Sequence, residues 1–130
     1  MHILTSYLDQ YQHDLRRAFY RRSTKDNMIL FTQRYRDHVR EANLRLHFIT
    51  SYKLPQTSPL RAQWTKQALF YFLLAFEDIK GLDFLTELHP RKRSFIEREA
   101  AHHFSGLRTL EDALQLSSLS PAFSPPPRSA

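Results

Sequence analysis

The sequence contains one uninterrupted apolar run, Ala68-Leu69-Phe70-Tyr71-Phe72-Leu73-Leu74-Ala75-Phe76. These nine residues are too few to cross a bilayer, which takes about 20 apolar residues in a helix. A helix that is apolar on every side belongs inside a bundle, where neighbouring helices cover it. We therefore expect a helix over residues 60–80 to form the buried centre of the fold.

Composition favours an all-α fold around this helix. The 130 residues include only two glycines, so the chain offers few of the tight turns that a sheet requires. The chain contains no cysteine, which leaves no disulfide, thiolate ligand or thiol nucleophile. We predict a single-domain bundle of four to five helices over residues 1–116. A disordered Ser/Pro-rich C-terminal tail is expected over residues 117–130, where little apolar surface is available for burial.

The first two helices are predicted from apolar spacing and capping residues. Apolar side chains recur every three or four residues over about 3–22, which predicts an amphipathic helix. Ser23 or Thr24 can cap a second helix that extends to about residue 52. It is the longest helix that we expect in the chain.

Proline and glycine mark the later boundaries. Pro55 ends the second helix, while Ser58 and Pro59 suit the cap and first position of the third. We expect the third helix to end at Lys80, with Gly81 as a left-handed C-cap. The remaining elements are expected to be a helical turn or two over 82–88, a helix over 89–106 and a short helix over about 109–116.

The second helix has two apolar faces. At about 100° per residue, one stripe faces the core: Met28, Phe31, Tyr35, Val39, Ala42, Leu46 and Ile49. A second row of apolar side chains lies on the opposite side of the helix, and either another layer of helix or a partner subunit must cover it. Because aromatic residues are enriched at interface centres, we predict that this row binds a partner. The predicted partner-binding residues are Leu30, Leu44, Phe48 and Tyr52.

We interpret these features as those of a non-enzymatic helical protein-binding module. Such a module would act as an accessory or regulatory factor through protein–protein contacts. A second subunit would also complete the cover around the central apolar helix. We therefore expect a homodimer.

The charge of the chain suggests a first alternative, nucleic-acid binding. The formal net charge is +6, and the basic excess lies in the first two helices and at Arg91-Lys92-Arg93. Arginine-rich helical surfaces bind phosphates with little sequence preference. The predicted residues are Arg16, Arg17, Arg21, Arg22, Arg36 and Arg40. Interspersed carboxylates at helical spacing leave open a different interpretation, a solvated surface of ion pairs.

A short motif suggests a second alternative. The segment Arg98-Glu99-Ala100-Ala101-His102-His103 resembles the active motif of HEPN ribonucleases. The resemblance covers these six residues and implies a dimeric bundle. In it, Arg98 would hold the scissile phosphate and His103 would transfer a proton. Glu99 stands where that family usually has a polar amide or a similar residue.

Other classes of site are disfavoured by the motifs that the chain lacks. Two glycines do not make a P-loop or a Rossmann fingerprint, and there is no Gly-x-Ser-x-Gly nucleophile elbow. Glu99 and His102 form a single Glu-x-x-His pair, whereas di-iron bundles use two. We expect no cofactor and no metal. The N-terminus lacks a signal-peptide pattern, and no segment is long and apolar enough to span a membrane. We therefore expect a cytoplasmic protein.

Overall fold

A computed structural model describes residues 2–103 of the chain. This part contains helices and no strand, which confirms the all-α prediction. Its elements are α1 (His2–Tyr20), α2 (Thr24–Ser51), α3 (Pro59–Leu88), the short 3-10 helix η1 (Pro90–Lys92) and α4 (Arg93–His103). The predicted helix over 109–116 and the predicted disordered tail lie outside the described residues.

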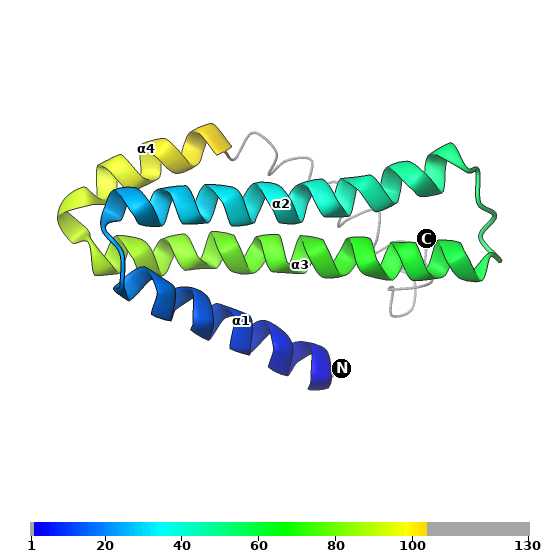
Figure 1. Cartoon of the computed structure of the whole chain (residues 1–130), viewed down its shortest axis with the longest axis horizontal. Coiled ribbons are helices and arrows are strands. Elements are labelled where there is room, and N and C mark those ends of the chain that lie inside the picture. Colours follow the sequence, from blue (N-terminus) through cyan, green and yellow to red (C-terminus); the bar gives the residue numbers. More distant parts are fainter. Residues whose placement is uncertain (1, 104–130) are drawn as a thin grey trace, which may run out of the picture.

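The two longest helices, α2 and α3, run antiparallel and side by side as a long hairpin (Figure 1). Helix α1 packs on α3, and α4 packs mainly on α2, so the two shorter helices lie on opposite sides of the hairpin. Helices α1 and α4 both lie toward the end of the hairpin that is formed by the start of α2 and the end of α3. The turn that joins α2 to α3 projects beyond them.

Side-chain caps begin the two long helices where the sequence predicts them. The Ser23 hydroxyl accepts a hydrogen bond from the Asp26 backbone N–H at 3.2 Å, and Ser58 does the same for Arg61 at 3.4 Å. Each such cap typically contributes about 1 kcal/mol. Pro59 occupies the first turn of α3, where a missing N–H leaves no bond unmade. The Ser58 cap thus fixes the start of α3 at the hairpin turn, and the Ser23 cap fixes the start of α2 at the opposite end of the hairpin.

The apolar run of α3 lies inside the fold, as predicted. Ala68, Phe72, Leu74 and Ala75 are buried, and the other five residues of the run are partly buried. The core is completed by apolar side chains from the other three helices. Its largest fully buried members are Phe19, Phe31, Phe72, Leu85 and Ile96. Within the described residues, no helix combines the length and the apolar character needed to cross a membrane.

The predicted end of the third helix is wrong, and the reason is the packing of α1. Helix α3 continues through Gly81 to Leu88, and Gly81 does not have a positive φ. A Cβ atom at Gly81 would lie 2.7 Å from Leu15 Cδ2 and 3.3 Å from Phe19 Cε2. The glycine therefore allows α1 to approach α3 closely rather than ending the helix.

Candidate functional site

Three aromatic rings meet at the turn end of the hairpin. Phe48 comes from the last turn of α2, Tyr52 directly follows that helix, and Trp64 comes from the second turn of α3. Their ring centroids are 5.6 Å apart for Phe48–Trp64, 5.9 Å for Tyr52–Trp64 and 6.2 Å for Phe48–Tyr52. Separations in this range are favourable for tilted aromatic pairs. The cluster therefore joins the two helices just before their connecting turn.

Two leucines extend this cluster along the helices. Leu44 precedes Phe48 by four residues on α2, and Leu60 precedes Trp64 by four on α3, so each shares a face with its ring. We call these five residues the aromatic end: Leu44, Phe48, Tyr52, Leu60 and Trp64. Tyr52 is 64% exposed, Leu60 41% and Leu44 40%. The described helices α1 and α4 lie toward the other end of the hairpin (Figure 1). The aromatic end is therefore an apolar surface without a cover from these helices.

The sequence around the aromatic end carries charge of one sign. Residues 42–76 include Arg45, Lys53, Arg61 and Lys66 but no aspartate or glutamate. Lys53 and Lys66 are exposed, whereas Arg61 donates to the Leu54 carbonyl at 3.0 Å. The aromatic end is thus an apolar surface in a positively charged surrounding.

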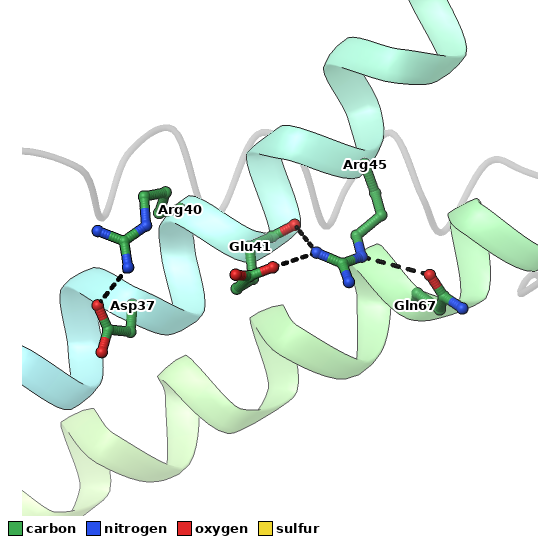
Figure 2. A network of polar contacts seen from close by, with 5 residues as sticks. All are labelled: Asp37, Arg40, Glu41, Arg45 and Gln67. Carbon is green, nitrogen blue, oxygen red and sulfur yellow. Dashed lines mark hydrogen bonds and ion pairs between the residues drawn. The ribbon is translucent and has the colours of Figure 1, made fainter.

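Arg45 has a structural role beside this surface (Figure 2). Its guanidinium pairs with the Glu41 carboxylate, and its Nε donates to Gln67 Oε1 of α3 at 3.3 Å. The same guanidinium lies 4.7 Å from the centroid of the Tyr71 ring, a cation–π distance. Arg45 therefore joins α2 to α3 and is not a free cation.

The structure brings together three of the four predicted partner-binding residues. Leu44, Phe48 and Tyr52 belong to the aromatic end, where Trp64 joins them from α3. Leu30 does not, because it is partly buried against the core near the start of α2. At a rise of about 1.5 Å per residue, Leu30 lies roughly 21 Å along the helix from Leu44.

A buried carboxylate that the sequence prediction missed links three helices. Asp78 of α3 is fully buried. Tyr11 of α1 donates a hydrogen bond to Asp78 Oδ1, and His38 Nδ1 of α2 lies 2.6 Å from Asp78 Oδ2. A buried carboxylate needs such partners, because an unpaired one is costly to remove from water. Asp78 therefore holds α1 and α2 against the central helix.

The surroundings of this carboxylate shift the pKa values of both Asp78 and its hydrogen-bond donor Tyr11. Burial raises the pKa of Asp78, and the hydrogen bonds from His38 and Tyr11 and the charge of Arg34 oppose that rise. Burial, with the neighbouring Asp78 carboxylate, raises the pKa of Tyr11 as well. Both shifts favour the neutral forms of these groups. The arrangement is that of a structural clamp.

The arginines predicted to bind nucleic acid lie on two separate surfaces. Arg16, Arg17, Arg21 and Arg22 are exposed near the carboxyl end of α1, and none belongs to an ion pair within residues 2–103. An open hollow of about 440 Å³ is lined by Asp14, Arg17, Ala18, Arg21 and Arg22. The predicted salt-bridged surface is therefore not found on α1 in the described part of the chain.

Arg36 and Arg40 lie on α2, away from that surface. Arg40 Nη2 donates to Asp37 Oδ1 at 2.7 Å, and this ion pair is exposed (Figure 2). Arg36 Nη2 is 3.4 Å from His103 Nδ1 of α4. Since α4 and α1 lie on opposite sides of the hairpin, the structure does not combine the two arginine groups into one patch.

The two residues of the ribonuclease-like motif point in different directions on α4. Five residues of helix correspond to about 500°, so Arg98 and His103 are about 140° apart around the axis. His103 lines a groove of about 370 Å³ between α2 and α4, with Lys25, Met28, Ile29, Thr32, Gln33, Phe95 and Glu99. Arg98 is exposed and is not among the lining residues. Burial and the nearby Arg36 lower the pKa of His103.

Metal ligands and known relatives give no further guide to the site. No group of three or more His, Asp or Glu side chains within residues 2–103 is placed to hold a metal ion. Comparison of the chain with protein-family models, with curated proteins and with solved structures finds no match. Function must therefore be argued from the geometry of the chain itself.

Proposed function

We propose that the protein is a non-enzymatic helical binding module, an accessory or regulatory factor that docks a protein partner on its aromatic end. The observation that supports this proposal is the uncovered cluster of Leu44, Phe48, Tyr52, Leu60 and Trp64 at the hairpin turn. Tyrosine and tryptophan dominate the binding energy of protein interfaces, where single truncations often cost about 2 kcal/mol or more.

The charge of this region favours an acidic partner. Residues 42–76 carry four Lys/Arg and no carboxylate. Complementary charge around an apolar centre speeds association and selects the partner. A fitting partner is an amphipathic segment with leucine or phenylalanine on one face and aspartate or glutamate on the other. Its apolar face would cover the rings while its carboxylates meet Lys53 and Lys66.

A second copy of the chain is the other possible occupant, as the homodimer prediction has it. In a two-fold dimer the same patch of each subunit faces its copy. Two aromatic ends would then bring regions of like charge together, which opposes self-association at this surface. We therefore favour a different, acidic chain over a homodimer at the aromatic end.

A capture experiment tests the proposal. The full chain is immobilised and exposed to a lysate of its source cells after nuclease treatment, and retained proteins are identified by mass spectrometry. We expect an acidic protein to be retained by the wild type and lost with the Leu44→Glu/Tyr52→Glu double variant. Ile3→Glu is the matched control, because Ile3 is a highly exposed apolar residue on α1. It should retain the same protein.

Mass measurement by light scattering separates the two occupants. A monomeric wild type that captures an acidic chain supports the proposal. A dimer that Leu44→Glu/Tyr52→Glu converts to monomer would assign the aromatic end to self-association instead. Equal capture by the wild type and the double variant would remove the aromatic end from the binding function.

A further inference from the structure

The opposite end of the hairpin brings together two connections that are far apart in sequence. The chain passes from α1 to α2 at residues 21–23, and from α3 to α4 at residues 89–92. Both connections lie at the end of the molecule away from the α2–α3 turn (Figure 1). They belong to different parts of the chain, and only the fold makes them neighbours.

A buried asparagine holds these two connections together. Asn27 is fully buried, and its Nδ2 donates to the Phe19 carbonyl at 2.9 Å and to the Arg22 carbonyl at 3.4 Å. The same atom lies 3.5 Å from Nε2 of His89, the residue before η1. Asn27 therefore fixes the position of 21–22 relative to 89–92.

The two connections are rich in exposed cations. We call this group the basic end, and its five exposed members are Arg21, Arg22, Lys25, Arg91 and Lys92. None of the five belongs to an ion pair within residues 2–103, although Asp26 and Glu87 are exposed in the same segments. By contrast, Arg93 is paired with Glu97 at 2.9 Å. Arg22 Nη1 donates to the Ala18 carbonyl at 2.9 Å, whereas the other four cations have no such bond within these residues and can meet an anionic ligand.

An exposed aromatic residue directly precedes two of these cations, Arg21 and Arg22, in the chain. Tyr20, the last residue of α1, is 66% exposed, and its ring packs edge-on against Phe84 at a centroid distance of 5.4 Å. The Arg16 guanidinium lies over the same Phe84 ring at 5.0 Å. The Phe84 ring therefore contacts the side chains of both Tyr20 and Arg16, and its contact with Tyr20 limits the orientations of the Tyr20 ring. Arg21 and Arg22 also line the open hollow on α1, together with Asp14, Arg17 and Ala18.

We propose that the basic end binds the phosphate backbone of a single-stranded nucleic acid, with Tyr20 stacking on one base. Free guanidinium groups bind phosphate oxygens in a planar, bidentate manner. A solvent-facing ring beside a row of cations is the combination that single-strand binding surfaces use. The proposal does not rest on the protein-binding function, because it concerns the opposite end of the hairpin. Its footprint also differs from the arginines of α1 and α2 predicted from the sequence, since it includes Arg91 and Lys92 and excludes Arg36 and Arg40.

Binding to the full chain is measured by fluorescence anisotropy with a labelled single-stranded oligonucleotide at several salt concentrations. If most of the five cations contact phosphates, affinity should fall steeply with salt, with a slope of about −3 in log–log form at about 0.7 per contact. The Arg91→Glu/Lys92→Glu variant should bind at least about tenfold more weakly and with a shallower slope. Tyr20→Ala should bind about 5- to 100-fold more weakly.

The matched control is Arg36→Glu/Arg40→Glu, which changes the net charge equally on a different surface. We expect it to retain wild-type affinity within about threefold. Equal loss in the two double variants would show that only the net charge matters, and would overturn the assignment. Absent binding by the wild type, or tighter binding to phosphatidylserine vesicles than to the oligonucleotide, would overturn it as well. If circular dichroism shows that a variant does not fold, Arg91→Ala/Lys92→Ala takes its place with the same expected direction.

Discussion

His38 Nδ1 of α2 lies 2.6 Å from Oδ2 of the fully buried Asp78 of α3. The hydrogen bond from Tyr11 of α1 occupies the other carboxylate oxygen. A single carboxylate thus connects three helices inside the bundle. This relationship leads to the first two predictions.

Removal of the carboxylate should destabilise the fold strongly. Asp78→Ala leaves His38 and the Tyr11 hydroxyl without their shared partner in a partly buried site, and each such unsatisfied group costs about 1–3 kcal/mol. Urea unfolding followed by circular dichroism measures the change. Asp83→Ala is the control, because Asp83 is exposed on the same helix. A loss for Asp78→Ala no larger than for the control would show that the clamp adds nothing to stability.

The stability should also depend on pH through Asp78. Burial raises the folded-state pKa of Asp78 above its ordinary value of 3.8, so folding disfavours the charged form. The stabilising contribution is therefore fully present below the unfolded-state pKa and is lost as the pH rises through the folded-state pKa. We expect the free energy of unfolding of the wild type, relative to that of Asp78→Asn, to fall as the pH rises from below 3.8. A relative free energy that rises with pH would indicate instead that His38 stabilises the charged carboxylate.

The close approach of α1 to α3 gives a third prediction. A Cβ atom at position 81 would lie 2.7 Å from Leu15 Cδ2, so the larger side chain of Gly81→Val overpacks this contact. Overpacking of this kind typically costs about 1–3 kcal/mol of stability. Adding Leu15→Ala should recover part of this loss by making room. Urea unfolding of the two single variants and the double variant measures the coupling. Strictly additive losses would contradict direct contact between the two positions.

The aromatic end should tolerate charge without loss of the fold. Leu44 and Tyr52 are exposed, so replacing both with glutamate should cost little beyond the two aromatic pairs of Tyr52, about 1–3 kcal/mol at most. Thermal unfolding of the variant checks this directly. A large loss would mean that these side chains stabilise the monomer, and that they serve packing rather than docking.

Local signals in the sequence are enough to predict the helices and most of their ends. Serine caps and proline breaks act within one turn, so Ser23, Ser58 and Pro59 can be interpreted without a fold. The role of Gly81 could not be predicted in this way. A glycine that ends a helix and a glycine that allows a close helix contact have the same sequence signal, and only the fold shows that Leu15 packs against Gly81. The core stripe of α2 was predicted from its period alone, and Met28, Phe31 and Ala42 are buried.

The site is less predictable, because its members come from different helices. Four-residue spacing relates Leu44, Phe48 and Tyr52, but only the hairpin brings Trp64 to them. Helical spacing alone also placed Leu30 among the predicted partner-binding residues, although Leu30 is partly buried against the core. Asp78 was missed for the same reason, since its partners lie 67 and 40 residues away in the sequence. The available signal was the pair Glu77-Asp78 at the end of the long apolar run, because a charge in a buried helix needs a partner.

The most direct test of the central claim uses Trp64, the single tryptophan of the chain and part of the aromatic end. The purified full chain is titrated with a synthetic amphipathic peptide that carries leucine and phenylalanine on one helical face and glutamate on the other. We predict a saturable change in Trp64 fluorescence that weakens at least about tenfold in Leu44→Glu/Tyr52→Glu, and no comparable change with a lysine version of the peptide. No response to the acidic peptide, or an equal response to both peptides, would contradict the assignment of the aromatic end as a docking surface for an acidic partner.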